Sequence, residues 1–123
     1  MHAEQRARES GVNLPELLAR LEYDRQLLRE VFFIFNKEFP LLQAELTEAV
    51  ASCDFEKIRT TAHALKGMFA SLSFSNASSS AQRIERMATQ STLEGISDEL
   101  ARLDRKAILA QTALESVCQE VIR

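Results

Sequence analysis

The segment Ala62-His63-Ala64-Leu65-Lys66-Gly67 lies inside the stretch that decides the fold. His63 is one position past an apolar stripe, so its ring is expected at the rim of the buried face rather than in the core. Lys66 and Gly67 follow one helical turn later, on the same face. The stripe itself recurs at alternating spacings of three and four, which predicts an amphipathic helix; it comprises Phe55, Ile58, Ala62, Leu65, Phe69 and Leu72.

Gly67 is the unusual residue of this segment. A glycine inside a helix costs roughly 1 kcal/mol relative to alanine, so the helix alone would be more stable without it. A histidine that must receive a bulky anionic group would explain both neighbours, because Lys66 supplies charge and Gly67 supplies space. Two alternatives remain open: Gly67 permits close helix packing, or Lys66 is an ordinary solvated lysine.

The same periodicity continues outward and predicts an all-α protein, an antiparallel four-helix bundle with a short additional N-terminal helix. Residues 1–12 are expected to form a flexible N-terminal tail, and residues 13–123 the bundle. Pro40 is expected to kink or divide the second helix. The expected helix starts are Asn13, Asp24, Asp54, Asn76 or Ser75, and about Leu93, from which the last helix runs to Val121.

Composition restricts the class of protein. With 123 residues, 46% of them hydrophobic, and only three glycines, the chain predicts one compact helical domain. A net charge of -3 argues against nucleic acid as the main partner. Two cysteines are too few for a disulfide framework, and no run of apolar residues is long enough for a membrane span. These features favour a cytoplasmic protein.

The central segment resembles the active segment of the histidine-containing phosphotransfer (HPt) domains of two-component phosphorelays. The family pattern is approximately Ala-His-x-Leu-Lys-Gly, followed by small residues and Leu-Gly, and the resemblance extends from about Leu14 to about Val117. Met68 stands where the family has a small residue, and Ser73 where it has glycine. Neither change removes a group that handles phosphoryl, but Met68 puts the partner preference in question.

Glu85 is the expected partner of His63. If the turn between their helices is centred near Phe74, each lies 11 residues from it (74 − 63 and 85 − 74), at the same height of an antiparallel pair. A carboxylate that accepts from Nδ1–H would leave Nε2 as the nucleophile. The resemblance supports this role, because the family has Gln or Glu at this offset; Gln82 is the second choice.

The resemblance implies a phosphoryl carrier that exchanges its group at His63 with an aspartate of a response-regulator receiver domain. Lys66 would pair with the phosphoryl oxygens, and Gly67 would leave room for them. The three glycines are isolated, so no phosphate-binding loop is possible and no autonomous kinase activity is expected. We expect no cofactor of its own, with Mg²⁺ on the partner receiver domain.

The expected partners are a receiver domain, a hybrid sensor histidine kinase, or both, with no nucleic acid, no membrane insertion and a monomeric state. One alternative is a phosphoacceptor module excised from a hybrid or chemotaxis-type histidine kinase, and another is a binding-only helical bundle. A carboxylate-bridged metal enzyme would need Glu-x-x-His pairs, but Thr60 occupies the position three residues before His63.

Two surface features complete the expectations. Phe32 and Phe33 differ by about 100° around a helix, so one of them should be exposed or capped by the first helix. An exposed one near the site would be available for docking. By resemblance, Leu17 and Leu21 of the first helix are also docking candidates. A basic rim around His63 would suit an acidic receiver pocket; its candidates are Lys57, Arg59, Lys66, Arg83 and Arg86.

Overall fold

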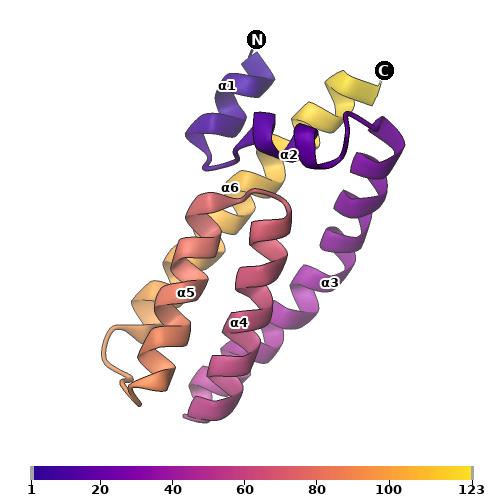
Figure 1. Cartoon of the computed structure of the whole chain (residues 1–123). Coiled ribbons are helices and arrows are strands. Elements are labelled where there is room, and N and C mark those ends of the chain that lie inside the picture. Colours follow the sequence, from indigo (N-terminus) through magenta and orange to yellow (C-terminus); the bar gives the residue numbers. More distant parts are fainter. Residues whose placement is uncertain (1, 123) are drawn as a thin grey trace.

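The computed structural model describes residues 2–122, with side chains described for residues 5–119. Within this range the chain forms six helices and no extended strand (Figure 1). They are α1 (His2–Glu9), α2 (Leu14–Arg20), α3 (Arg25–Ala51), α4 (Phe55–Ser71), α5 (Ser75–Thr89) and α6 (Ile96–Ile122). None of the helices in the described part of the chain is both long enough and apolar enough to span a membrane.

The four long helices α3 to α6 form the predicted all-α bundle. Each packs against its neighbour along the chain, and α6 also contacts α3, so the four helices close around one core. Phe35 lies at the centre of that core, where its ring meets Phe39, Phe69 and Phe74 at centroid distances of 5.2, 6.2 and 5.3 Å. The short helices α1 and α2 lie at the end of the bundle that carries the α4–α5 turn (Figure 1).

Residues 2–9 form α1 where the sequence predicted a tail. The segment is rich in alanine, glutamate, glutamine and arginine, which are good helix formers. It has almost no apolar stripe, so periodicity did not reveal it. Its anchor is Ala7, which is fully buried where α1 packs against α6.

Side-chain caps open three helices at the predicted residues. Asn13 accepts from the amide of Glu16 at 3.2 Å, Asp24 from Leu27 at 3.0 Å, and Asp54 from Lys57 at 3.1 Å. Each side chain satisfies an amide that would otherwise lack a partner in the first turn.

The predicted cap of α5 at Ser75 or Asn76 is wrong. Phe74 occupies the cap position and makes no side-chain hydrogen bond. The segment before α2 substitutes for the cap, because the Ser75 amide donates to the Gly11 carbonyl at 2.8 Å and the Asn13 amide donates to the Ser73 carbonyl at 2.9 Å. This antiparallel contact joins parts of the chain about 60 residues apart, which local sequence cannot reveal.

Pro40 does not divide α3, which runs as one helix from Arg25 to Ala51 (Figure 1). The last helix begins at Ile96, three residues later than predicted, because Leu93–Gly95 belong to the preceding turn.

Helices α2 to α5 end with a non-glycine residue in the left-handed region. In α4, the amide of Phe74 donates to the carbonyl of Phe69 and the amide of Ser73 to that of Ala70, which is the Schellman pattern. That pattern favours glycine at the left-handed position. Here the position is held by Glu22 (φ 54°), Cys53 (55°), Ser73 (57°) and Ser91 (54°), and Tyr23 (58°) follows Glu22 in the same region.

Candidate functional site

His63 lies at the surface of α4, as predicted. Its side chain is 66% exposed, whereas Ala62 and Leu65 on either side of it are fully buried. The backbone of α4 is therefore fixed by the core, while the imidazole ring lies at the exposed edge of the α4–α5 interface.

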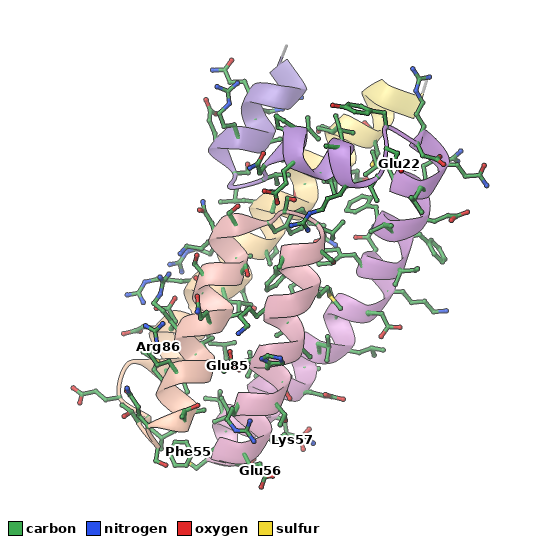
Figure 2. The ribbon with its side chains drawn as sticks, in the orientation of Figure 1. Glu22, Phe55, Glu56, Lys57, Glu85 and Arg86 are labelled. Carbon is green, nitrogen blue, oxygen red and sulfur yellow. The ribbon has the colours of Figure 1, made fainter. Side chains whose placement is uncertain are left out.

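Glu85 of α5 contacts both His63 and Lys66 of α4 across this interface. Its Oε2 lies 2.7 Å from Nδ1 of His63, and its Oε1 accepts a hydrogen bond from Nζ of Lys66 at 2.8 Å. Figure 2 shows Glu85 on the side of α5 that faces α4 and Arg86 on the outer side of α5. The predicted equal height of His63 and Glu85 is thus confirmed as a direct contact.

The hydrogen bond from Lys66 lowers the pKa of Glu85 below its ordinary value of 4.5, against a smaller opposing effect of burial, and the contact with His63 lowers it further. Glu85 is therefore ionised at neutral pH. An ionised carboxylate can only accept, so the contact with Nδ1 favours a proton on that nitrogen. In the neutral ring, Nε2 then holds the free lone pair and faces away from Glu85.

Gly67 borders open space. A Cβ built on it would meet no atom within 4 Å outside its own stretch of helix. The alternative that this glycine permits close packing within the chain therefore finds no support. The glycine costs helix stability, and its missing side chain leaves open surface one turn from His63.

The two departures from the family pattern lie away from the imidazole. Met68 is partly buried and packs against the core. Ser73 adopts the left-handed conformation (φ 57°), which accounts for glycine being usual there, and its hydroxyl donates to Oε1 of Glu16 at 2.8 Å. That bond fastens α2 to the end of α4, where Arg20 also donates to the carbonyl of Ala70 at 2.7 Å.

The predicted basic rim separates into groups. Lys66 is paired with Glu85. Nε of Arg83 lies 3.3 Å from Oε1 of Glu99 on α6, so Arg83 belongs to the α5–α6 contact. Gln82, the second choice for contacting His63, is exposed and makes no side-chain hydrogen bond among the residues whose side chains are described.

The docking candidates also separate. Leu17 is fully buried and cannot contact a partner, whereas Leu21 is half-buried. Phe33 is 67% exposed and Phe32 is buried, as one of the two predicted outcomes requires. However, Phe33 borders a hollow of about 530 Å³ lined by residues of α3 and α6, whereas His63 lies at the α4–α5 interface.

Sequence reasoning missed Glu99, which is buried at 4% exposure between Arg83 and Arg102. Its Oε2 has no partner among the described side chains. The signal was present, because Glu99 occupies the core-facing position between Ile96 and Leu103 in the helical repeat. A carboxylate at such a position requires a partner from a neighbouring helix.

Comparison with known protein families identifies the family to which the chain belongs. Residues 12–120 match the family described as Hpt domain, which is nearly the whole chain. Searches of curated proteins and of solved structures found no match. The chain belongs to the Hpt domain family, and its role is therefore phosphotransfer in two-component signalling. Proteins of this family are phosphocarriers that interact with receiver domains and kinases.

No group of three or more potential metal-ligating side chains occurs within the described part of the chain. At the site, the carboxylate of Glu85 is already paired with Lys66 and in contact with His63.

Proposed function

We propose that this chain accepts a phosphoryl group on Nε2 of His63 from an aspartyl phosphate of a response-regulator receiver domain, and returns it by the reverse reaction. One observation supports this most strongly. Oε2 of Glu85 lies 2.7 Å from Nδ1 of His63, so Nε2 faces away from Glu85 on a side chain that is 66% exposed.

The transfer balances as a single displacement. The lone pair of Nε2 attacks phosphorus, the P–O bond of the aspartyl phosphate breaks as the P–N bond forms, and the receiver recovers its carboxylate. The imidazole ring becomes cationic because Nδ1 keeps its proton. Glu85 stabilises that charge from 2.7 Å, since an ionised acceptor strengthens the hydrogen bond as the ring becomes positive.

Lys66 and Gly67 serve the incoming group. Lys66 is held on the α5 side of His63 by Glu85, and a lysine side chain can rotate from Oε1 toward the phosphoryl oxygens without leaving its helix position. The open surface at Gly67 admits those oxygens and the receiver surface that carries them. Phosphoryl transfer depends mainly on placement and charge neutralisation, and these residues supply both.

The partner proteins would supply the metal ion and the kinase activity that the reaction sequence needs. Mg²⁺ would be held by the receiver domain, and the chain would have no autonomous kinase activity. A cytoplasmic, monomeric state is part of the proposal, in keeping with two cysteines that form no disulfide. A module of a hybrid or chemotaxis-type histidine kinase would use the same chemistry at His63.

The test is transfer of labelled phosphoryl from a panel of phosphorylated receiver domains with Mg²⁺. We expect acid-labile, base-stable label on the native chain and none on His63→Gln. His2→Gln, the same substitution at the other histidine, is the matched control and should label like the native chain. If His63→Gln labels equally, or if no receiver in the panel labels the native chain, the binding-only bundle becomes the better account.

A further inference from the structure

The charge balance at the site is incomplete. Glu85 is in contact with Lys66 at 2.8 Å, so the carboxylate and the ammonium group largely cancel before any phosphoryl group arrives. A phosphoryl group adds roughly −1.5 to −2 charges near neutral pH, by analogy with phosphorylated hydroxyl side chains. The imidazole ring becomes cationic on transfer and offsets about one of these charges, so net negative charge remains at the site. Lys66 can turn toward it only by giving up its contact with Glu85. The site therefore needs a second cation.

Arg59 has the position for this role. It precedes His63 by four residues on α4, and side chains at this spacing are neighbours, with Cβ atoms about 5–6 Å apart. At about 100° per residue, Arg59 and Lys66 lie within roughly 20° of each other around the helix, both on the α5 side of His63. One cation is thus a turn before the imidazole ring and the other a turn after it.

Arg59 is also available. It is exposed, and it takes part in no ion pair or side-chain hydrogen bond among the residues whose side chains the structure describes. The other rim candidates are excluded by their positions. Arg83 is paired with Glu99, Arg86 lies on the outer side of α5, and Lys57 lies on the side of α4 away from α5 (Figure 2).

We propose that Arg59 is the second phosphoryl-binding cation of the site and that it contacts the phosphoryl oxygens once the group is on Nε2 of His63. The guanidinium group presents a planar fork of donors that matches phosphoryl oxygens, and it keeps its charge at any pH used by the cell. Arg59 and Lys66 then hold the group from its two sides along α4, while Glu85 stays with Nδ1.

This inference rests on the proposed function, and its experiment separates the two. The chain is phosphorylated with phosphoramidate, so that no receiver domain is needed. The P–N bond of the donor breaks, a P–Nε2 bond forms, and ammonia leaves with a proton from solvent. The phosphorus resonance of the product is then followed by ³¹P NMR as a function of pH, together with the rate of its appearance.

In Arg59→Gln we expect the titration midpoint of the phosphoryl group to rise by about 0.5 pH unit, because a lost neighbouring cation disfavours the dianion. We expect the rate of acceptance to fall by roughly fivefold, less than for removal of a buried donor. Arg59→Lys should restore most of both. Lys57→Gln and Arg86→Gln remove the same charge from positions that do not face His63, and they should behave like the native chain.

Two results would overturn the role of Arg59 while leaving the proposed function intact. One is a native chain that is labelled at His63 together with an Arg59→Gln variant that titrates and reacts identically. The other is an equal effect of Lys57→Gln, which would show that only net charge matters. If the native chain is not phosphorylated at His63 at all, the proposed function fails first.

Discussion

At the scale of single residues, Glu85 connects the side chains of the candidate site. Its carboxylate forms hydrogen-bond contacts with both His63 and Lys66, and it does so from a different helix. It therefore links α4 to α5, and in the proposed function it leaves Nε2 as the reactive nitrogen of the imidazole ring. Its pKa is lowered by these contacts, so the carboxylate is ionised at neutral pH and can hold both partners.

The pKa of Glu85 predicts how this link depends on pH. Its folded-state value is lowered below 4.5, so the ionised form contributes stability that is complete above 4.5 and is lost as pH falls through the lowered value. Glu85→Gln should therefore reduce the free energy of unfolding at pH 7 by on the order of 1 kcal/mol. The difference should disappear in strong acid. Urea denaturation followed by circular dichroism measures both, and a difference that persists in strong acid would contradict the assignment.

At the scale of helices, the C-terminal ends show a feature that the apolar stripes do not reveal, which is non-glycine residues in the left-handed conformation. The chain closes α2 to α5 with Glu22, Cys53, Ser73 and Ser91 in the conformation that glycine adopts most easily. The left-handed region costs a non-glycine residue roughly 1–2 kcal/mol. Only where the side chain makes a compensating contact, as Ser73 does with Glu16, is part of that cost offset.

Substitution of the left-handed residues by glycine tests this account. Cys53→Gly should raise the free energy of unfolding by about 0.5–1 kcal/mol, because relief of strain exceeds the larger chain entropy of glycine. Ser73→Gly should gain less, since it also removes the hydrogen bond to Glu16, and Ser73→Ala should be destabilising because it loses the bond and keeps the strain. Urea melts under reducing conditions compare the three. An equal gain at both glycine sites would mean that the Glu16 bond contributes nothing.

The sequence predicted what local spacing controls. The stripe around His63, the caps at Asn13, Asp24 and Asp54, and the equal height of Glu85 all follow from counting along helices. Prediction from the sequence was wrong where contacts between distant segments determine a helix start or a side-chain direction. The start of α5 depends on Gly11, which lies about 60 residues away, and the direction of Arg83 depends on Glu99 of α6.

At the scale of the whole molecule, the site lies away from one end of the bundle. We call this the closed end, because α1 and α2 lie there beside the α4–α5 turn. His63 and Glu85 belong to α4 and α5, whereas α2 and the Gly11–Asn13 segment contact the α4–α5 turn and α1 packs against α6 at the same end of the bundle (Figure 1). On the other side, α3 and α6 are joined by Gln43 with Asp104 at 2.8 Å. We therefore expect that changes at the end of the bundle that carries α1 and α2 leave phosphoryl acceptance at His63 unchanged.

The N-terminal helix provides the test of this separation. Ala7→Glu places a charge at a fully buried position, so α1 should detach from α6 and the free energy of unfolding should fall by roughly 1–3 kcal/mol. Hydrogen exchange should become fast in α1, while phosphoryl acceptance at His63 stays at the native level. Gln5→Glu introduces the same charge on the exposed face of α1 and should leave α1 in place. A loss of acceptance in Ala7→Glu would show that the closed end and the site are coupled.

The exposed Tyr23, at the corner between α2 and α3, has a practical consequence. The chain contains one tyrosine and no tryptophan, and that tyrosine is 70% exposed. Its ring is exposed to solvent in the folded protein and in the unfolded chain. We therefore expect tyrosine fluorescence to change little when the phenylalanine core unfolds. The same emission will respond to anything that covers the α2–α3 corner. The molecule thus carries a built-in optical probe that is nearly silent to unfolding and sensitive to contact at that corner.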